Sequence, residues 1–510
     1  MHGQMIAVDN LDKLLSRTFR KRNIEGNSAS IESVLSMASS DLPSIGLLGL
    51  GTMGANLALN IAEKGFPLAV YNRTHAVTMK FHASAGELAG QLTPTETLEE
   101  FVSSIKPPRN IILMVPAGAV VDAQIEALRP LLDKDDMIID AGNANFDDTN
   151  RRAEEARDSI EMFLGIGVSG GEVGARNGPS IMGGGDRPAW DRMAPVLEAI
   201  SAKFEGQACA TYMGEAGAGH YVKMVHNGIE YADMQMIAEV YGIMRDGFGM
   251  SAPEIGDVFD HWNKGPLQSY LIEISAEVAK ATDEKTGKPM LDVILDSAGQ
   301  KGTGRWTAIE ALHRASPVTA IDAAVAARNL SSRLEERKTG EGIFGAAPKS
   351  INRDDLSLEV LEQALLAGKV ACYAQGFAML DSASDHYGWK LPLPDIAEVW
   401  REGCIIRSAM LDDMATALKD DPDSNLMFAD AFADKMKSTH GGLRKVVAVA
   451  ATNGTPVPAL SAALSYFDTM RTSRGTANMI QGQRDFFGAH SFGRLDEEGA
   501  HHGPWALGTI

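Results

Sequence analysis

A glycine-rich turn between two apolar runs constrains this chain more than any other feature of its 510 residues. The apolar run 45–48 (IGLL) is followed by residues 49–54 (GLGTMG), by a helical stretch to Lys64 and by a second apolar run at 67–71. This order predicts a strand, a tight turn, a helix and a second strand. Such a unit opens a doubly wound α/β sheet that binds a dinucleotide.

The glycine spacing gives the physical reason for that prediction. Gly49 permits the tight turn, Gly51 lets a pyrophosphate approach the backbone, and Gly54 allows the helix to pack on the strand. The alternative is that these glycines only form a turn. The residues predicted to bind the cofactor here are Gly49, Leu50, Gly51, Thr52, Met53 and Gly54.

The residues after the second strand bear on the choice of cofactor. An NAD-binding site usually carries an acidic residue there, which bonds the ribose 2′-hydroxyl. This chain has Asn72, Arg73 and Thr74 instead. A guanidinium pairs with a 2′-phosphate that a carboxylate would repel, so the sequence favours NADP, with NAD possible. The alternative is that Arg73 is a surface residue without a ligand.

Further apolar runs extend this unit into a domain, and the rest of the chain differs in character. Residues 110–115 and 137–139 each end in small or polar residues, as buried parallel strands do. Later stretches rich in Ala, Leu, Met and Glu predict helices. The sequence therefore predicts an α/β Rossmann-type domain, then a large all-α domain and a tail. The expected parts are an extension of unknown role (1–41), the dinucleotide domain (42–216), the helical domain (217–482) and the C-terminal tail (483–510).

One helical segment carries a short polar patch on an otherwise apolar helix. Its residues Lys223, His226, Asn227, Glu230 and Tyr231 fall at i, i+3, i+4, i+7 and i+8, so they share one helix face. A solvated face would normally run the whole length of the helix. Partly desolvated Lys and Glu side chains have tunable pKa values, so the patch supplies a candidate base and a candidate acid. The alternative is a structural Lys–Glu pair with a satisfied His.

The charge and the cysteines exclude several classes of protein. A formal net charge of −20 argues against a nucleic-acid partner or an anionic-membrane surface, and no apolar run approaches the roughly 20 residues that span a bilayer. The three cysteines are far apart and in no metal-ligand spacing, so we expect neither a metal site nor disulfides, and a reducing cytoplasm fits best. An anionic ligand must therefore meet a local cluster of Lys and Arg.

Two glycine-rich segments are further candidates for anion binding. Residues 165–171 (GIGVSGG) are expected to form a small-residue loop that offers backbone amides and the Ser169 hydroxyl to an oxyanion, or else a flexible connector. Residues 299–306 (GQKGTGRW) place Lys301 and Thr303 in a glycine frame that suits a phosphate or a carboxylate. The second segment lacks the spacing of a nucleotide-binding P-loop.

Taken together, these segments resemble the 6-phosphogluconate dehydrogenase family. The resemblance begins at about residue 43 and runs to the C-terminus. Its most specific pieces are 222–231 (VKMVHNGIEY), 142–149 (GNANFDDT), 168–176 (VSGGEVGAR), 301–306 (KGTGRW), 400–408 (WREGCIIRS) and 483–490 (QRDFFGAH). Six segments in the same order do not agree by chance, so the chain is identified as a member of this family.

The resemblance implies a reaction and a set of site residues. Members of the family oxidise and decarboxylate 6-phosphogluconate to ribulose 5-phosphate with a nicotinamide dinucleotide and without a metal. It implies that Lys223, neutral when it acts, is the general base and that Glu230 is the general acid. The implied substrate-binding residues are Asn143, Ser169, Gly170, Gly171, His226, Asn227, Tyr231, Lys301, Thr303, Arg328, Arg484 and His490. Beyond the glycine turn, the residues expected to bind the cofactor are Asn72, Arg73, Thr74, Val115, Pro116, Ala117 and Asn143.

The resemblance also implies a partner. Arg484 and His490 are similar to tail residues that members of the family insert into the site of the partner subunit, so a homodimer with exchanged C-terminal tails is expected. Two alternatives stay open. One is a shorter β-hydroxyacid dehydrogenase with a similar nucleotide domain, and the other is a non-catalytic NADP-binding homologue.

Overall fold

The computed structural model describes residues 42–505 apart from positions 160, 301 and 423. Its first part is built on an eight-stranded sheet of order β10-β7-β6-β5-β4-β1-β2-β3, in which β7 and β10 run opposite to the other strands. The bounds are β1 (Ile45–Leu48), β2 (Leu68–Tyr71), β3 (Leu92–Pro94), β4 (Asn110–Leu113), β5 (Met137–Asp140), β6 (Met162–Val168), β7 (Ile181–Gly185) and β10 (Ala210–Gly214). Strands β8 (Lys203–Phe204) and β9 (Gln207–Ala208) form a separate ribbon.

Helices cover both faces of this sheet, which explains the unbroken apolar runs of its strands. Strands β1, β4 and β5 are buried along their whole length. The strands predicted from the sequence are present as β1, β2, β4 and β5. The covering helices are α3 (Thr52–Glu63), α4 (His75–Ser84), α5 (Leu98–Ser103), α6 (Ala119–Leu128), α7 (Phe146–Arg157), α8 (Gly171–Asn177) and α9 (Arg187–Ile200).

The prediction of a loop at 165–171 is wrong in its first half. Strand β6 continues to Val168, so the loop begins only at Ser169. The glycines lie in the strand because helix α10 (Ala218–Gly242) packs directly against it. A Cβ on Gly167 would lie 2.5 Å from the Cβ of Lys223, closer than two carbon atoms that are not bonded to each other can come. Glycine in a strand marks such a close approach of another element.

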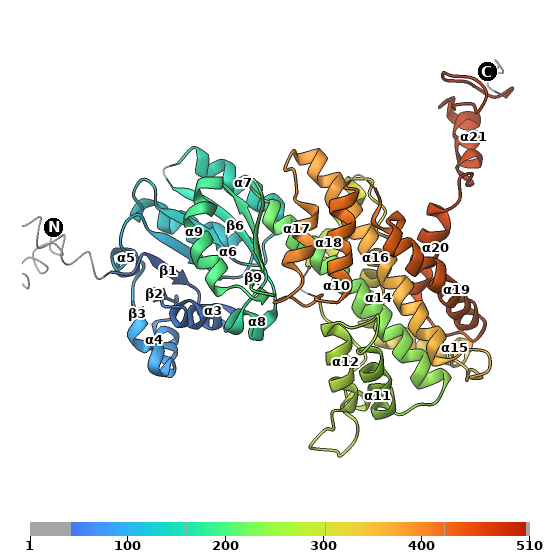
Figure 1. Ribbon diagram of the computed structural model, residues 1–510, viewed down its shortest axis with the longest axis horizontal. Coiled ribbons are helices and arrows are strands. Elements are labelled where there is room, and N and C mark those ends of the chain that lie inside the picture. Colours follow the sequence, from blue (N-terminus) through green and yellow to red (C-terminus); the bar gives the residue numbers. More distant parts are fainter. Residues whose placement is uncertain (1–41, 160, 301, 423, 506–510) are drawn as a thin grey trace, which may run out of the picture.

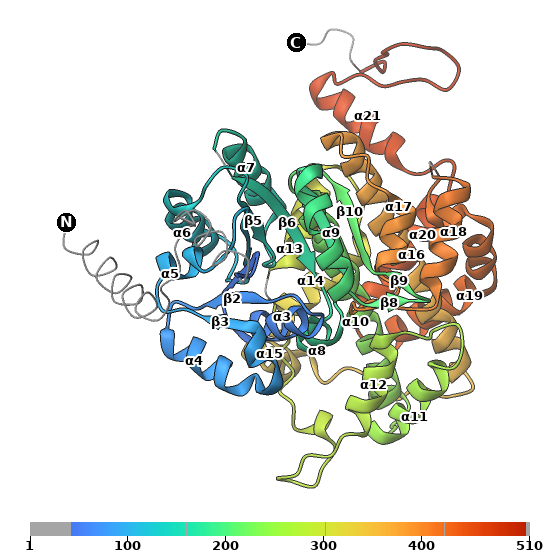
Figure 2. The same ribbon diagram turned by 60° about the vertical axis from the view of Figure 1, so that its left-hand side comes forward.

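The second part of the chain is helical, and α10 lies between it and the sheet (Figures 1 and 2). After α10 come α11 (Ala252–Trp262), α12 (Tyr270–Lys280), α13 (Thr303–His313), α14 (Thr319–Ser331), α15 (Leu334–Phe344), α16 (Leu358–Tyr387), α17 (Leu393–Val399), α18 (Met410–Asp420), α19 (Asp430–Thr452), α20 (Pro458–Met470) and α21 (Ala477–Gly488). A π turn follows α10 at Ile243–Gly247, and short 3₁₀ turns lie at Gly86–Gln91, Arg129–Leu131, Met290–Asp292 and Leu426–Phe428.

The first turn of α10 touches the backbone of the sheet. A Cβ on Gly219 would lie 2.4 Å from the carbonyl oxygen of Met182, 2.6 Å from the backbone nitrogen of Gly184 and 2.8 Å from the carbonyl oxygen of Gly165. Only a residue without a side chain fits against three backbone groups at once. The two parts of the chain are therefore joined by contacts between backbones, which fix where the following turns of α10 lie.

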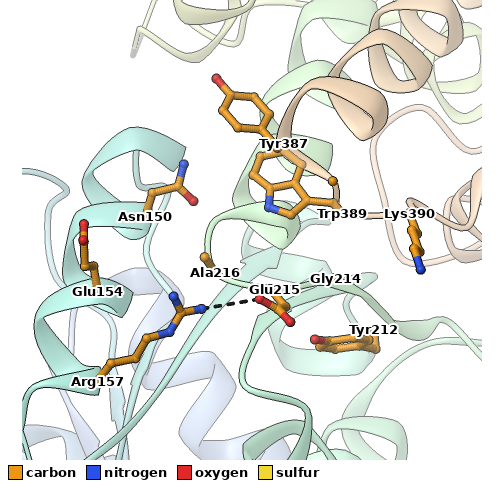
Figure 3. A pocket seen from close by; sticks show the side chains of 11 residues that line it. Asn150, Glu154, Arg157, Tyr212, Gly214, Glu215, Ala216, Tyr387, Trp389 and Lys390 are labelled. Carbon is orange, nitrogen blue, oxygen red and sulfur yellow. Dashed lines mark hydrogen bonds and ion pairs between the residues drawn. The ribbon is translucent and has the colours of Figure 1, made fainter.

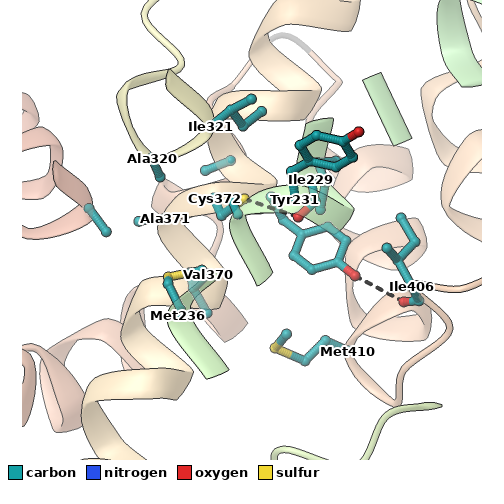
Figure 4. Close-up of a cluster of buried hydrophobic side chains, with 14 of the residues drawn as sticks. Ile229, Tyr231, Met236, Ala320, Ile321, Val370, Ala371, Cys372, Ile406 and Met410 are labelled. Atoms are coloured by element: carbon teal, nitrogen blue, oxygen red, sulfur yellow. Dashed lines mark hydrogen bonds between the residues drawn. The ribbon is translucent and has the colours of Figure 1, made fainter. Parts of the chain in front are cut away.

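Beyond its first turns, α10 is buried in the core of the helical part. Figure 4 shows side chains of α10, α14 and α16 that meet there, with Ile406 and Met410 from the segment around α18. The Tyr373 hydroxyl donates to the carbonyl oxygen of Ile406 at 3.0 Å. Apolar packing of its remaining faces explains why α10 is buried for most of its length although it carries the polar patch.

The C-terminal segment leaves this body. Helix α21 projects from the helical part beyond α20 in both views (Figures 1 and 2). It runs across position 483, where the tail was expected to start. Its apolar side chains Met479, Ile480, Phe486 and Phe487 are exposed, with 66%, 58%, 70% and 73% of their surface accessible. An exposed apolar set of this size on one short helix suits contact with another molecule.

The predicted fold class is confirmed. A Rossmann-type α/β sheet is followed by a large all-helical part and a C-terminal tail. Within residues 42–505, apart from the three positions left out, no helix is both long enough and apolar enough to cross a membrane. The described part also has no group of three or more His, Cys, Asp or Glu side chains placed to hold a metal ion.

The backbone contact of α10 can be tested by substitution of one glycine. We expect Gly219→Ala to lower the free energy of unfolding by roughly 1–3 kcal/mol, since the new methyl group must displace backbone atoms. Gly242→Ala in the same helix is the control, because a Cβ there meets nothing within 4 Å. It should raise that free energy by about 0.5–1 kcal/mol. Chemical denaturation of both variants measures the difference, and equal effects would contradict the close approach.

Candidate active site

The glycine turn joins β1 to α3 as the sequence predicts. Gly49 has a φ of 103°, a backbone conformation that favours glycine, and its N–H donates to the carbonyl oxygen of Tyr71 at 2.9 Å. A Cβ on Gly54 would lie 1.9 Å from the carbonyl oxygen of Gly49. The turn is therefore closed by two glycines that cannot carry a side chain.

The outer side of the turn is open. A Cβ on Gly51 would meet nothing within 4 Å, so a ligand can approach the backbone there. Helix α3 starts at Thr52 with no side-chain cap and no acidic residue in its first turn. Its first N–H groups thus face this space without an intramolecular acceptor, which suits a pyrophosphate. Leu50 and Met53 complete the predicted turn.

Asn72 and Arg73 have different environments at the end of β2. The side chain of Asn72 accepts a hydrogen bond from the backbone N–H of Leu50 at 3.2 Å, and its backbone N–H donates to Thr78 Oγ1 at 3.1 Å. Arg73 is exposed and has no hydrogen bond or ion pair with other described residues. Thr74, also exposed, precedes α4. Asn72 therefore holds the turn, whereas the Arg73 guanidinium is available to a ligand.

The remaining predicted cofactor residues lie at the same edge of the sheet. Val115, Pro116 and Ala117 follow β4, and Asn143 follows β5. Because β1, β4 and β5 are parallel, their carboxyl ends share one edge with the glycine turn. Pro116, Ala117 and Asn143 are exposed there. The structure thus brings together all the residues predicted to bind a dinucleotide.

The predicted polar patch on α10 forms a hydrogen-bonded cluster with the loop after β6. Lys223 Nζ donates to Ser169 Oγ at 3.0 Å and to Asn227 Oδ1 at 2.9 Å, and it lies 3.5 Å from His226 Nδ1. Asn227 Nδ2 donates to Thr303 Oγ1 at 2.9 Å. The cluster therefore joins α10, the loop after β6 and the start of α13.

His226 closes this cluster into a ring of contacts. Its Nδ1 lies 3.0 Å from Asn227 Oδ1, and its Nε2 lies 3.3 Å from Ser169 Oγ. The ring is satisfied when Nδ1 carries the proton and Nε2 accepts from the Ser169 hydroxyl. Burial holds the pKa of His226 well below its ordinary value, so the imidazole is neutral in this arrangement.

Burial moves the pKa values of the candidate base and acid in opposite directions. Lys223 has 8% of its surface accessible, and desolvation lowers the pKa of its amine, against a smaller opposing effect of Glu230. Desolvation likewise raises the pKa of Glu230, against the charges of Lys223 and Arg328. Each group is thus shifted toward its neutral form, as expected for charges removed from water. The structural Lys–Glu pair considered above does not form directly, since Lys223 bonds to neutral partners instead.

Tyr231, Arg328 and α13 border the same cluster. The Arg328 guanidinium lies 3.5 Å from the centre of the Tyr231 ring and donates to the carbonyl oxygen of Gly299 at 3.3 Å. A Cβ on Gly304 would lie 2.4 Å from the Tyr231 ring, so α13 packs closely there. Glu230 Oε2 lies 3.8 Å from His226 Nδ1.

The loop Ser169-Gly170-Gly171 is held from behind by the 400–408 segment. Gly170 and Gly171 have φ values of 100° and 61°, and a Cβ on Gly170 would lie 2.5 Å from the carbonyl oxygen of Gly403. The Trp400 ring packs edge-on against His226, with 5.6 Å between ring centres. The segment that contributed only to the family resemblance therefore supports both the loop and the imidazole.

Two predicted substrate residues are not brought to the cluster, and a third cannot be placed. Lys301 lies outside the described residues. Arg484 and His490 lie on and after α21, which projects away from α10 (Figure 1). The Arg484 guanidinium donates to Gln481 Oε1 at 3.1 Å within the tail itself. Within one chain these two side chains therefore cannot reach the Lys223 cluster.

Sequence reasoning missed the buried groups that support the loops. His220 Nδ1 lies 2.8 Å from Thr149 Oγ1 and Nε2 lies 3.2 Å from the carbonyl oxygen of Gly142, which fixes the residue before Asn143. The buried Arg152 contacts Asp140 Oδ2 at 3.2 Å and the carbonyl oxygen of Gly118 at 3.1 Å. The position of His220, one turn before Lys223, was a usable signal. Nothing in the sequence distinguished Arg152 from a surface residue.

A separate cavity of about 630 Å³ lies between α7, β10 and the end of α16 (Figure 3). Its lining includes Arg157 and Glu215, whose charged groups lie 3.4 Å apart, and the stacked rings of Tyr387 and Trp389. It shares no residue with the cluster around Lys223. The predicted chemistry therefore belongs to the cluster and not to this cavity.

The fold and the site together define a nicotinamide-dependent dehydrogenase: a Rossmann sheet whose carboxyl edge carries a dinucleotide turn beside a desolvated amine and a desolvated carboxyl group. Sequence comparison then gives the family. Residues 44–214 match the NAD binding domain of 6-phosphogluconate dehydrogenase, and residues 219–505 match the 6-phosphogluconate dehydrogenase C-terminal domain. The chain belongs to the decarboxylating 6-phosphogluconate dehydrogenase family, which confirms the resemblance seen in the sequence.

Known relatives cover nearly the whole described chain. An NAD(+)-dependent and an NADP(+)-dependent decarboxylating 6-phosphogluconate dehydrogenase of Bacillus subtilis are each 48% identical, over 91% and 90% of this chain and 99% and 98% of their own length. A 6-phosphogluconate dehydrogenase of Plasmodium falciparum, solved alone, with NADP+ and with 6-phosphogluconate, has a TM-score of 0.87 at 41% identity. That comparison covers 91% of this chain and 100% of the other.

The neutral surroundings of Lys223 can be tested by one isosteric change. We expect Asn227→Asp to raise the pKa of Lys223, because a carboxylate would replace the amide oxygen 2.9 Å from Nζ. The rate of reductive methylation of Lys223 at neutral pH should fall roughly tenfold, since each pKa unit changes the neutral fraction tenfold. Mass spectrometry of the labelled peptides measures this, with exposed Lys437 as the internal reference. An unchanged rate would contradict the assigned contact.

Proposed function

We propose that this chain oxidises 6-phosphogluconate at C3 and decarboxylates the product to ribulose 5-phosphate and carbon dioxide, with NADP as the hydride acceptor. The observation that carries the proposal is the buried Lys223 amine, bonded to Ser169 and Asn227 beside the dinucleotide edge of the sheet. Membership of the family supplies the substrate, and the site supplies the acid and base groups that such a reaction needs.

Lys223 acts as the general base in the first step. A lysine must be neutral to accept a proton, and burial lowers the pKa of this amine. Its activity as a base is therefore lost as the pH falls through a pKa that lies below the ordinary lysine value. Lys223 takes the proton of the C3 hydroxyl, and NADP, when bound, would supply the acceptor for the hydride of C3. Loss of a proton and a hydride leaves a 3-keto acid.

The second step uses the same amine and Glu230. The C1 carboxylate lies β to the new carbonyl group, so carbon dioxide can leave and the electron pair passes to the enolate oxygen. Lys223, now charged, stabilises that oxygen in a site from which water is excluded. Glu230 then protonates the carbon that lost carbon dioxide, which is C2 of the substrate and C1 of the five-carbon enediol, since burial raises the pKa of its carboxyl group and keeps its proton available.

The substrate phosphate and sugar hydroxyls are assigned to the remaining cluster residues. Asn143, Ser169, Gly170, Gly171, His226, Asn227, Tyr231 and Thr303 surround the position of the sugar acid. Arg328, whose guanidinium lies over the Tyr231 ring, supplies positive charge for the phosphate together with Lys301. In a chain of net charge −20 these cations, together with Arg484 from a second copy of the chain, must provide the local attraction for the phosphate.

Arg484 and His490 complete the site from a second copy of the chain and bind the substrate phosphate there. We propose a homodimer whose C-terminal tails are exchanged, because these side chains lie beyond the reach of their own Lys223 cluster. The exposed Met479, Ile480, Phe486 and Phe487 of α21 support this, since association buries such apolar surface. The proposal places the enzyme in the cytoplasm, where the buried free cysteines Cys209, Cys372 and Cys404 stay reduced.

The two alternatives from the sequence now differ in standing. The match of residues 219–505 to the family excludes a shorter β-hydroxyacid dehydrogenase. A non-catalytic homologue is tested directly by absorbance at 340 nm with 6-phosphogluconate and either NADP or NAD. Release of carbon dioxide together with the reduced cofactor would support the proposed enzyme activity. No reduction with either cofactor would favour a non-catalytic homologue.

Lys223→Met tests the base. We expect turnover to fall at least about a hundredfold, the usual contribution of a positioned general base, with NADP binding unchanged. Initial rates at 340 nm and fluorescence titration of the cofactor measure the two properties. Lys437→Met is the matched control, because that side chain is exposed and pairs only with Asp434. Normal turnover of the Lys223 variant would remove this residue from the base role.

Arg73→Ala tests the choice of cofactor. We expect the KM for NADP to rise roughly tenfold or more, the loss of about one charge-assisted hydrogen bond, while the KM for NAD changes little. Exposed Arg187, on the far end of the sheet, supplies the control Arg187→Ala. Rates with both cofactors measure the effect. Equal changes in the two KM values would overturn the assignment of Arg73 to the 2′-phosphate.

A further inference from the structure

A single buried carboxylate organises the C-terminal tail. Asp485 has 1% of its surface accessible, although its neighbours Phe486 and Phe487 are 70% and 73% exposed. Its Oδ1 accepts from the backbone N–H of Ser491 at 3.0 Å and contacts His502 Nδ1 at 2.7 Å. Helix α21 projects from the rest of the chain (Figure 1), so the residues that shield Asp485 from solvent must belong to the tail itself.

The second oxygen of Asp485 holds the end of the described chain. Its Oδ2 accepts from the backbone N–H of Gly503 at 2.8 Å and from Trp505 Nε1 at 3.0 Å. Phe492 and His501 pair as a short antiparallel bridge, with both N–H···O distances at 2.9 Å. The chain after α21 therefore folds back as a loop, and the Asp485 carboxylate closes it with four contacts.

This closure fixes the turn that carries His490. Ala489 and Ser491 on either side have φ values of 48° and 58°, which residues with a side chain rarely adopt. The backbone N–H of Ser491 is one of the four donors to Asp485. A Cβ on Gly488 would lie 2.6 Å from Nε2 of His490, so the imidazole folds back over that glycine. The turn is tight, and Asp485 supplies a bond that holds it.

Arg484 is tied to the same turn through Gln481. Gln481 Oε1 accepts from the Arg484 guanidinium at 3.1 Å, and Gln481 Nε2 donates to the carbonyl oxygen of Ser491. Asp485 and Gln481 thus hold the two sides of Ser491. The cation and the imidazole that the proposed function assigns to the substrate phosphate are placed relative to one another by these contacts.

We propose that Asp485 is a positioning residue. It folds the tail into a rigid loop that holds Arg484 and His490 in a fixed arrangement before these two side chains bind the substrate phosphate in the partner subunit. The inference rests on the proposed function of those two residues. Asp485 does not touch the phosphate itself, because four donors occupy its oxygens and two anions would repel. The backbone N–H of Gly503 also holds the pKa of Asp485 below its usual range, so the carboxylate stays charged.

Kinetics of the full-length Asp485→Asn enzyme test the proposal. An amide turns its NH₂ group toward two of the four donors, so the loop opens while the side chain keeps its size. We expect the KM for 6-phosphogluconate to rise roughly tenfold, about 1.4 kcal/mol, with the KM for NADP unchanged and kcat altered far less. Trp505→Phe removes a single donor, and we expect a smaller rise in the same KM.

A matched control lies on the same loop. Asp496→Asn makes the same change in charge at an exposed residue that pairs with Arg494 and does not contact Asp485. It should leave both KM values as they are. Light scattering of every variant measures whether two chains still associate. It separates a loss of phosphate binding from a loss of the dimer.

Arg484→Ala separates this inference from the proposed function. If that variant raises the KM for 6-phosphogluconate while Asp485→Asn does not, the tail binds phosphate but Asp485 does not position it. If Arg484→Ala also leaves this KM unchanged, the assignment of the tail to the phosphate fails. A loss of kcat with both KM values preserved in Asp485→Asn would likewise overturn the positioning role.

Discussion

The contact between α10 and the backbone of the sheet is the constraint on which the rest of the structure depends. Gly165 and Gly167 on β6 and Gly219 on α10 carry no side chains where the two elements touch. Because the backbones meet directly, Lys223 on the next turn lies within hydrogen-bond distance of Ser169 at the end of β6. One contact thus joins the two parts of the chain and withdraws the amine from water.

The choice of partners for the amine matters as much as its burial. Lys223 bonds to a hydroxyl and an amide, whereas a carboxylate at the same distance would hold it in the charged form. Glu230 lies two turns along the helix, beyond direct contact with the amine, and burial favours its neutral form as well. The cluster therefore holds an amine and a carboxyl group that are both shifted toward their neutral forms and do not pair with one another.

Much of this arrangement could be predicted from the sequence, because it depends on local patterns. The glycine turn, the strands β1, β2, β4 and β5 and the polar face of α10 follow from spacing and apolar runs. The prediction of a loop at residues 165–168 is wrong, because Gly165 and Gly167 lie in a strand against which α10 packs. That helix begins about fifty residues later, so the local sequence does not show the contact. Gly403 supports the Ser169 loop from a segment more than two hundred residues away, and Trp400 packs on His226 from the same distant segment. No local pattern encodes such contacts.

Asn72 and Arg73 are adjacent but have different environments, one bonded within the fold and the other exposed. Asn72 is committed to the turn through the N–H of Leu50, whereas Arg73 bears no part of the fold. A change at position 73 is therefore expected to leave the glycine turn intact. Under the proposed role of Arg73, nucleotide preference is a modular property of this fold: it depends on one exposed side chain that can be exchanged while the turn and the Lys223 cluster keep their structure.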